Sequence, residues 1–297
     1  MTKGPIGIVG AGRVGQALGR LLHDAGLPVV AIASRTKAHA SAAAAFVGAG
    51  VHPLDYADLP RSCCRLIIAV PDDALPAVAC LLRESGWKDG IVIHTSGVNG
   101  TDVLNGLQAE GSSCAALHPL QTVPSPENGL KGLIGCQYVL TGDGEAAEWA
   151  REIVVILGGT LLELPNEARA LYHAAAVLLC NDFVVLAEAG LRLLEEAGLS
   201  REVAARAFIA LADQSVKNVF SMPRGAALTG PVARGDTGTI RKHLVAIGSR
   251  NGRSGEIREI ETIYRVLGRL AIRLARERGL EESRGRELSD LLEKRRR

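Results

Sequence analysis

The chain has 297 residues, 47% of them hydrophobic and 22% charged, a composition that excludes disordered and fibrous proteins. Its net charge of +2 is spread over the whole length without a basic stripe interleaved with aromatic residues, so we expect no nucleic-acid partner. The basic run at 294–297 is most simply a solvated helix end. Two domains are the expected organisation for a chain of this length.

Short apolar runs and helical patterns alternate through the first half of the chain. The runs predict strands at residues 5–9, 28–33, 65–70, 90–94, 114–118, 137–141 and 160–164. Helices are expected at 16–22, 37–47, 73–84 and 145–157, with a short one capped by Thr101 or Asp102 and a proline-rich loop at 119–126. This alternation predicts an α/β domain over residues 1–164, with a parallel sheet covered by helices on both faces.

After Pro165 only helical spacing remains. Helices are predicted at 167–197, 201–220, 237–247, 254–278 and, from a weaker pattern, 281–297, which gives an all-helical second domain over residues 165–297. The longest apolar stretch, 174–189, is interrupted by Asn181 and Asp182. We interpret it as a helix buried in the domain, too short and too polar to span a bilayer, and expect no membrane partner.

A glycine motif directly follows the first predicted strand. Gly10, Gly12 and Gly15 have the spacing G-x-G-x-x-G and open a predicted helix. The first glycine permits a tight turn, the second lets the backbone approach a pyrophosphate, and the third lets the helix pack on the strand. The helix N-terminus offers unpaired N–H groups to the anion. A dinucleotide site is therefore predicted, with a turn that binds no nucleotide as the alternative; its residues are Gly10, Ala11, Gly12, Arg13, Val14 and Gly15.

The end of the second predicted strand distinguishes NADP from NAD. An NAD site usually places an acidic residue there, on the ribose 2′-OH. This chain has Ser34, Arg35 and Thr36 instead, and no Asp or Glu between residues 28 and 53. Because a guanidinium flanked by hydroxyls can bind a 2′-phosphate, we predict NADP. The alternative is a solvated loop arginine.

The cysteines predict neither a metal site nor disulfides. Cys63, Cys64, Cys80, Cys114, Cys136 and Cys180 form no C-x-x-C pair, and no histidine stands at ligand spacing. We expect reduced, mostly buried thiols. The first predicted strand begins within a few residues of Met1, which leaves no room for a signal peptide and favours a cytoplasmic protein.

Reduction of a C=O or C=N bond needs a group that gives a proton or positive charge to the developing anion. His173, on a helix expected to face a substrate cleft, and Asn181, near the same helix face, are candidates. A packed histidine in a helix interface is the alternative for His173. His118 and Ser96 follow strands at the carboxyl edge of the sheet, where ligands bind. Ser96 is alternatively a turn hydroxyl before Gly97.

One further candidate lies in the helical half. Residues 229–236 (TGPVARGD) contain few helix formers and connect two predicted helices. Arg234 has the planar fork that suits a substrate carboxylate. Asp236 is a competing partner, either in an Arg–Asp pair or as the cap of the next helix.

These motifs together resemble the β-hydroxyacid dehydrogenase, pyrroline-5-carboxylate reductase and ketopantoate reductase superfamily. More closely, the chain resembles Rossmann-like proteins with a DUF2520 C-terminal domain, through segments 94–97 (HTSG), 117–122 (LHPLQT), 171–176 (LYHAAA) and 228–236 (LTGPVARGD). The resemblance implies a Rossmann domain followed by an all-α domain of the 6-phosphogluconate dehydrogenase C-terminal-like type. It also implies cofactor contacts at Ala69, Val70, Pro71 and Thr95.

One position departs from this superfamily. The hydroxyacid dehydrogenases place a catalytic lysine, with an asparagine four residues later, on the first long helix of the second domain. The helix predicted from Glu167 onward has no lysine; its polar residues near the start are Arg169, Tyr172 and His173. Because the usual proton donor is missing, a histidine is the expected acid.

We therefore predict an NADPH-dependent oxidoreductase that reduces a small, carboxylate-bearing oxo or imino acid, with a 2-oxo acid of the ketopantoate type as the specific hypothesis. His173 or His118 acts as the acid, and Asn181, Ser96 or Arg234 orients the substrate. Two alternatives stay open: an NADP(H)-sensing protein without catalysis, and a scaffolding dimer built on the helix at 167–197. A homodimer is compatible with each.

Overall fold

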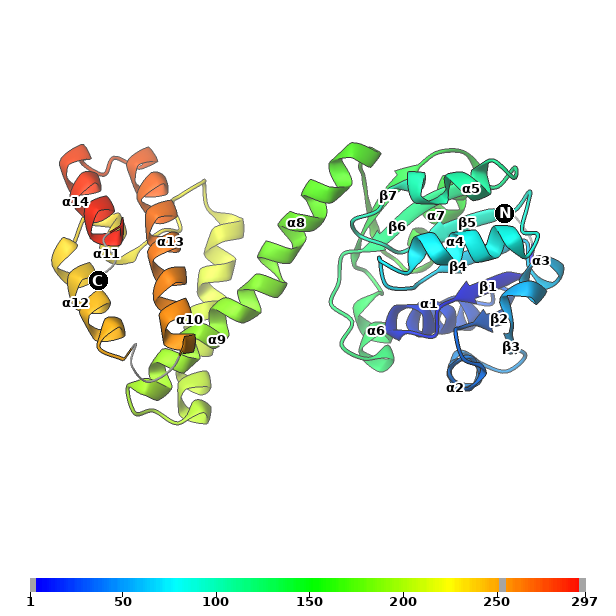
Figure 1. Cartoon of the computed structure of the whole chain (residues 1–297), viewed down its shortest axis with the longest axis horizontal. Coiled ribbons are helices and arrows are strands. Elements are labelled where there is room, and N and C mark those ends of the chain that lie inside the picture. Colours follow the sequence, from blue (N-terminus) through cyan, green and yellow to red (C-terminus); the bar gives the residue numbers. More distant parts are fainter. Residues whose placement is uncertain (1–3, 251–254, 294–297) are drawn as a thin grey trace. The chain divides into compact units, whose positions relative to one another are not determined.

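The computed structural model describes residues 4–250 and 255–293. The chain divides into two compact units, Met1–Cys180 and Asn181–Arg297 (Figure 1). The first unit contains a sheet with its helices, and the described part of the second is helical. The predicted α/β domain with a helical C-terminal part is therefore confirmed. The first unit extends beyond the last strand to Cys180, so it includes the helix that carries His173.

Within the described residues, eight strands form one sheet in the order β3-β2-β1-β4-β5-β6-β7-β8. All neighbouring strands are parallel except β6 and β7. Every residue of β1 and β4 is buried, as expected for strands covered on both faces. The strand order places the topological switch point, where ligands bind such sheets, between β1 and β4. The strands are β1 (Ile6–Val9), β2 (Val29–Ala33), β3 (His52–Leu54), β4 (Arg65–Ile68), β5 (Ile91–His94), β6 (Ser113–Pro119), β7 (Gln137–Gly142) and β8 (Thr160–Glu163).

Helices cover both faces of this sheet (Figure 1). One face packs on α1 (Arg13–Asp24), α2 (Lys37–Val47) and α7 (Gly144–Ile156). The opposite face packs on α3 (Leu59–Ser62), α4 (Leu75–Glu84) and α5 (Asn105–Gln108). Short 3₁₀ helices lie between these elements: η1 (Tyr56–Asp58), η2 (Thr101–Leu104) and η3 (Asn166–Ala168). Two separate apolar cores result, one on each side of the strands.

Strand β7 runs antiparallel to β6, which corrects the expectation of a wholly parallel sheet. The connection between them was expected to be a loop, but it contains α6 (Pro126–Gly132), which packs on α1. Gly129 permits this contact, because a Cβ there would lie only 2.6 Å from the Cβ of Ala17. With its helix held against α1, the connection does not form the crossover that a parallel β6–β7 pair needs.

The edge strand β3 was not predicted. It has three residues and pairs with β2 through Ala31 and His52. Its central residue is Pro53, which an edge strand tolerates because one side of the strand needs no ladder hydrogen bonds. A strand so short, with a proline at its centre, has no apolar run that periodicity can detect.

The single helix predicted at 167–197 is divided. Helix α8 (Arg169–Leu179) ends at Cys180, whose backbone leaves the helical region with φ −120° and ψ −68°, and α9 (Asn181–Glu196) follows. The expectation that the stretch 174–189 is buried is also wrong, because Leu178 and Val184 are 65% and 58% exposed.

By length and composition alone, the stretch Asn166–Glu196 is able to cross a membrane. It has 31 residues, and its most apolar window has a mean hydropathy of 1.7 and is 0% buried. This stretch is longer than the apolar run at 174–189 considered from the sequence, so length and composition alone do not exclude a span. Apolar helices that pack inside soluble assemblies pass the same test.

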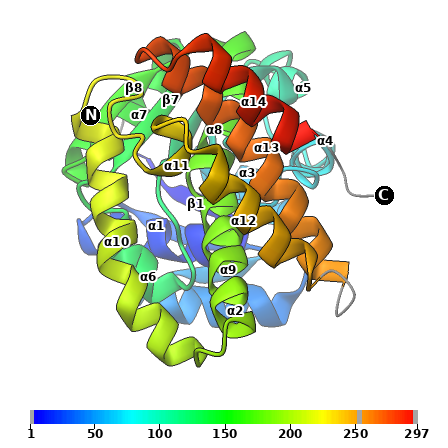
Figure 2. The same ribbon diagram turned by 90° about the vertical axis from the view of Figure 1, so that its left-hand side faces the viewer.

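The described part of the second unit consists of α9, α10 (Arg201–Ser221), α11 (Gly230–Ala233), α12 (Thr237–Gly248), α13 (Gly255–Glu277) and α14 (Glu282–Glu293) (Figure 2). Ile240, Ile272 and Leu288 form the centre of one core, and α9 packs on α13 through Leu193 and Ile260. The segment expected to be irregular before α12 contains the one-turn helix α11. The predictions for Ser254 and for 294–297 fall outside the described residues.

Candidate functional site

The glycine motif forms the turn between β1 and α1 at the carboxyl edge of the sheet. Gly10 has a φ of +117°, and a Cβ there would overlap the carbonyl oxygen of Ala69, directly after β4. A Cβ on Gly15 would overlap the carbonyl oxygen of Gly10. The fold itself therefore requires these two glycines.

Gly12 has a different reason for lacking a side chain. A Cβ there would meet nothing closer than the Ala69 carbonyl oxygen, at 4.0 Å, so packing does not demand a glycine. Gly12 is also the N-cap of α1, with no side chain to bind the first N–H groups and no acidic residue in the first turn. An open space beside unpaired N–H groups suits a pyrophosphate.

Ser34, Arg35 and Thr36 follow β2, which neighbours β1 in the sheet. The Arg35 side chain is exposed, and its charge reaches Tyr56, whose pKa burial raises and Arg35 partly lowers. The Thr36 hydroxyl accepts a hydrogen bond of 3.3 Å from the backbone N–H of His39 and so caps α2. One of the two predicted hydroxyl ligands is thus used by the fold, and Arg35 and Ser34 are left for a 2′-phosphate.

A second group of polar side chains lies at the carboxyl edge, where β6 ends and α8 begins. Nδ1 of His118 and Oη of Tyr172 are hydrogen-bonded at 2.8 Å, with the rings edge to face. Burial lowers the pKa of His118 to about 4, and the positive charge of Arg169 adds to that shift. Burial raises the pKa of Tyr172. Both side chains are therefore uncharged at neutral pH.

His173 adjoins this pair. Its ring lies 6.0 Å from the ring of His118, centroid to centroid, at an angle of 80°. Both imidazoles pack on Gly97, where a Cβ would overlap the His173 ring and lie 3.0 Å from Nε2 of His118. The structure thus brings the two predicted candidate acids together over the turn that follows β5. We call His118, Tyr172 and His173 the histidine cluster.

A buried cation accompanies the histidine cluster. Arg169 is 0% exposed and donates hydrogen bonds to the hydroxyl of Thr141, at 3.1 Å, and to the backbone carbonyl of Ser96. Its Nε has no partner among the described residues. Since both hydrogen-bond partners are neutral oxygens, the charge of Arg169 acts on its surroundings and helps to lower the pKa of His118 and of His94.

His94 and Ser96 hold the turn after β5. The fully buried His94 donates from Nε2 to the carbonyl of Gly100, at 2.9 Å, and accepts at Nδ1 from the N–H of Ser96, at 3.2 Å. Burial lowers its pKa to about 4, so the ring is neutral. The Ser96 hydroxyl accepts hydrogen bonds from the backbone N–H and the side-chain amide of Asn99, each at 3.0 Å. This geometry favours a turn-forming role for Ser96 over contact with a substrate.

Arg234 and Asn181 belong to the helical unit. Asp236 caps α12, accepting from the N–H of Thr239 at 2.9 Å and from its hydroxyl at 2.7 Å. These bonds lower the pKa of Asp236. Arg234 is exposed. Of the two alternatives for Asp236, an Arg–Asp pair or a helix cap, the structure shows the cap. Asn181 opens α9 and is also exposed.

The cysteines are free thiols, but the expectation that most are buried is wrong. Cys63 and Cys114 are buried, whereas Cys64 and Cys80 are exposed and the other two are intermediate. Only alternate residues of a strand, or one face of a helix, enter the core, and composition does not reveal which. Within residues 4–250 and 255–293, no group of three His, Cys, Asp or Glu side chains could hold a metal ion.

Sequence reasoning did not assign three residues that shape this site. Gly97 makes room for both imidazoles, Arg169 supplies the buried charge, and Tyr172 binds His118. A polar triplet of arginine, tyrosine and histidine within one turn and a half of an otherwise apolar helix was a usable signal for an inward-facing polar side. Spacing alone could not show that Arg169 is the buried member.

Two family models match this chain. The model described as a Rossmann-like domain matches residues 2–119, and the domain of unknown function DUF2520 matches residues 136–271. No curated protein is similar enough to match.

Solved structures share the fold over most of the chain. A candidate NADP oxidoreductase from Bacteroides fragilis is 23% identical, with a TM-score of 0.72, covering 91% of this chain and 98% of its own. A protein from Thermotoga maritima is 21% identical, with a TM-score of 0.66 and coverages of 92% and 99%. An imine reductase from Myxococcus stipitatus in complex with NADP⁺ is 15% identical, with a TM-score of 0.65 and coverages of 89% and 94%. The chain belongs to the proteins that join a Rossmann-like domain to a DUF2520 domain.

Proposed function

We propose that this protein is an NADPH-dependent oxidoreductase that reduces the C=O or C=N bond of a small oxo or imino acid. The observation that carries the proposal is the position of the histidine cluster at the same sheet edge as the open space beside Gly12. Ligands of open parallel sheets bind at this edge. The similarity in fold to an imine reductase bound to NADP⁺ supports reduction of such a bond.

The residues at the sheet edge fit NADPH. The unpaired N–H groups of α1 beside Gly12 would bind the pyrophosphate, and Arg35 with Ser34 would bind the 2′-phosphate. The turns after β4 and β5 would bind the nicotinamide half. When bound, this cofactor supplies a hydride. The remaining proposed contacts are Ala11, Arg13, Val14 and Gly15 in the first turn and Ala69, Val70, Pro71 and Thr95 in the others.

His173 is the proposed proton donor. His118 is less suited, because its pKa of about 4 leaves it uncharged at neutral pH and its Nδ1 is already bonded to Tyr172. His173 is half-buried and lies beside that pair. A proton given by His173 to the substrate oxygen or nitrogen neutralises the anion that forms there. The hydrogen-bonded His118 and Tyr172 keep the wall of the site uncharged and hold the start of α8 in place.

The proposed substrate carries a carboxylate. Arg234 offers an exposed guanidinium whose neighbour Asp236 is occupied as a helix cap, so its fork is free to bind an acid. Asn181 is the proposed second orienting group. The specific hypothesis is a 2-oxo acid of the ketopantoate type, and a cyclic imino acid is the second candidate, favoured by the fold shared with the imine reductase.

We propose further that the protein is a cytoplasmic homodimer. The apolar side chains exposed on α8 and α9 include Leu178, Leu179 and Val184, at 65%, 63% and 58%. Each Å² of such surface buried against a second copy contributes about 25 cal/mol, and two-fold pairing is the commonest arrangement. The free thiols, two of them exposed, fit a reducing compartment.

Consumption of NADPH tests the proposal. The purified protein should oxidise NADPH in the presence of at least one compound from a panel of 2-oxo acids and cyclic imino acids, and His173→Ala should slow that oxidation by about 10²-fold or more. If NADPH binds and no compound in the panel is reduced, the alternative of an NADP(H)-sensing or scaffolding dimer replaces the proposal.

A further inference from the structure

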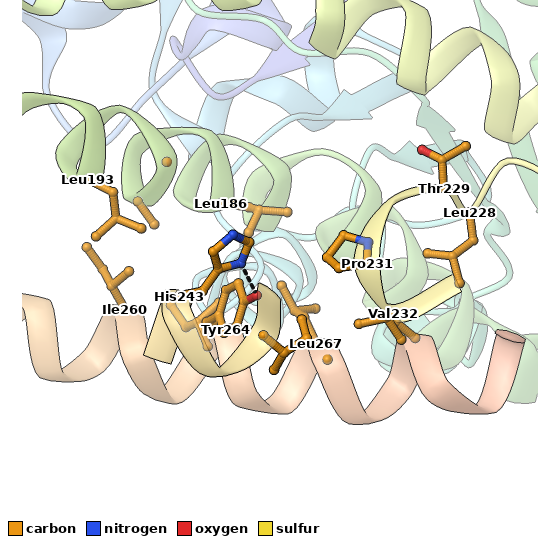
Figure 3. Close-up of a pocket in the computed structure, with 16 residues that line it drawn as sticks. Leu186, Leu193, Leu228, Thr229, Pro231, Val232, His243, Ile260, Tyr264 and Leu267 are labelled. Carbon is orange, nitrogen blue, oxygen red and sulfur yellow. Dashed lines mark hydrogen bonds between the residues drawn. The ribbon is translucent and has the colours of Figure 1, made fainter. Parts of the chain in front are cut away.

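We infer that the helical unit contains its own binding site for a small uncharged molecule, one with a hydrocarbon body and a single hydrogen-bonding group. The site is an open pocket of about 420 Å³ lined by α9, α11, α12, α13 and the segment that leads into α11 (Figure 3). Small-molecule sites in proteins range from roughly 300 to 1,000 Å³. The inference rests on this cavity alone and does not depend on the proposed reaction.

The walls of the cavity determine the charge of its ligand. Leu186, Leu193, Val232, Ile260 and Leu267 are among the apolar side chains that line it, and no Asp, Glu, Lys or Arg of the described residues does so. A carboxylate or phosphate placed here would lose its hydration without meeting a counter-charge. The cavity is therefore built for an uncharged molecule, and it differs in this respect from a site for an acid.

One polar pair stands among these apolar walls. Nδ1 of His243 and Oη of Tyr264 are hydrogen-bonded at 2.7 Å, with the rings edge to face, and Figure 3 shows both side chains at the cavity. Burial raises the pKa of Tyr264, so its hydroxyl stays protonated. The bond between the two residues leaves one imidazole nitrogen and a phenol lone pair unused. A hydroxyl or carbonyl group on the ligand matches this pair.

Gly190 lines the pocket from α9. It lies in the interior of α9, where glycine destabilises a helix relative to alanine, yet a Cβ at this position would meet nothing within 4 Å. The other helical glycine of the cavity, Gly268, has a packing reason, because its Cβ would lie 2.9 Å from the Leu292 side chain. Gly190 is exposed, so a larger side chain at this position would extend into the pocket without displacing a neighbour of the described chain.

A neutral fluorescent ketone, 6-propionyl-2-(dimethylamino)naphthalene, tests this inference on the full-length protein. Its emission shifts to the blue in apolar surroundings, so binding is read directly. We expect saturable binding that neutral 2-naphthol competes for and anionic 2-naphthoate does not. Gly190→Leu fills the cavity and should weaken probe binding about tenfold or more. Tyr264→Phe should weaken it about twofold to tenfold, through loss of one hydrogen bond.

The matched control is Gly238→Leu. Gly238 is an exposed helical glycine on α12 outside the cavity, where a Cβ makes only an ordinary contact, so this variant should bind the probe as the wild type does. Circular dichroism establishes that each variant is folded, and NADPH titration should give the same affinity for all of them. Equal probe binding by wild type and Gly190→Leu would overturn the inference. So would effective competition by 2-naphthoate, or a wild type that binds no probe because a second copy of the chain fills the space.

Discussion

His118 and Tyr172 are 54 residues apart in the chain, and their side chains are hydrogen-bonded at 2.8 Å. The bond fixes the start of α8 against the end of β6. Because His173 is the next residue on α8, it is held beside the sheet edge that carries the glycine turn. The sequence placed His173 in the second domain, but in the structure it belongs to the first unit, which carries the glycine turn.

Removal of the His173 imidazole should slow turnover without weakening the cofactor. We expect His173→Ala to lower kcat by about 10²-fold to 10⁴-fold, the usual contribution of a positioned acid, while the Kd for NADPH stays near that of the wild type. His173→Gln should be similarly slow, since an amide can form hydrogen bonds to the substrate but cannot deliver a proton. Steady-state kinetics and calorimetry measure the two quantities.

The same substitutions at His118 are the control for that experiment. His118 is neutral at physiological pH, so His118→Gln should affect kcat less than His173→Gln does. If both His173 variants keep wild-type turnover on an identified substrate, His173 is a packing residue and His118 becomes the candidate donor.

Acid should destabilise the protein between pH 6.5 and about 4. His94 and His118 have pKa values lowered from 6.5 to about 4 by burial, so the unfolded chain binds protons in this range before the folded protein does. The stability they give is complete above pH 6.5, is lost as the pH falls, and changes no further below about 4. Each residue accounts for up to about 3 kcal/mol.

Urea unfolding at pH 7, 5.5 and 4 measures that loss. His118→Gln removes one of the two titrating groups, so its stability should fall less steeply over the same range. A wild-type free energy of unfolding that is flat from pH 7 to 4 would show that the two histidines titrate normally in the folded protein.

The sequence predicted those features of the fold that neighbouring residues determine, and it did not predict those that depend on contacts between distant residues. The strand and glycine turn at Gly10 were predictable, because an apolar run and a backbone requirement are written into adjacent residues. The antiparallel direction of β7 was not predictable, because the connection before it packs on α1 through residues such as Gly129 and Ala17, which lie over a hundred residues apart in sequence. The end of α8 at Cys180 was not predictable either, because no glycine or proline marks it in the sequence.

The candidate site divides in the same way. His118 and Ser96 could be placed at the sheet edge, since each follows an apolar run. The burial and charge around these two residues could not be predicted. The burial of Arg169 and its hydrogen bond to the Ser96 carbonyl arise only when η3 and α8 pack against the sheet. The pKa of His118 depends on that burial, and so does the ranking of the two histidines as acids.

Exchange of one residue should reverse the cofactor preference. Arg35→Asp replaces the proposed partner of the 2′-phosphate with an acceptor for the ribose hydroxyl, so it should weaken NADP binding by about 1.5 to 3 kcal/mol and favour NAD. Titration calorimetry with both dinucleotides measures the change. Lys37→Ala, at the first residue of α2, is the control and should leave the preference for NADP in place. An unchanged ratio of the two affinities in Arg35→Asp would refute the assignment.

Light scattering tests the proposed dimer. Since the chain mass is 31.2 kDa, the species in solution at micromolar concentration should have twice that mass or more. Leu178→Glu places a charge on the exposed apolar surface of α8 and should shift the protein toward the monomer. A wild type that is wholly monomeric would rule out the homodimer and leave the assignment of the dinucleotide site untouched.

Isotope transfer tests the central claim most directly. NADPH that carries deuterium at the transferable position of the nicotinamide is incubated with the protein and with 2-oxo acids or cyclic imino acids, and the products are weighed by mass spectrometry. We predict a reduced product that contains the deuterium, formed by the wild type and strongly diminished in His173→Ala. Binding of NADPH with no deuterium transferred to any of these compounds would contradict the account, because the protein would then recognise the cofactor without using its hydride.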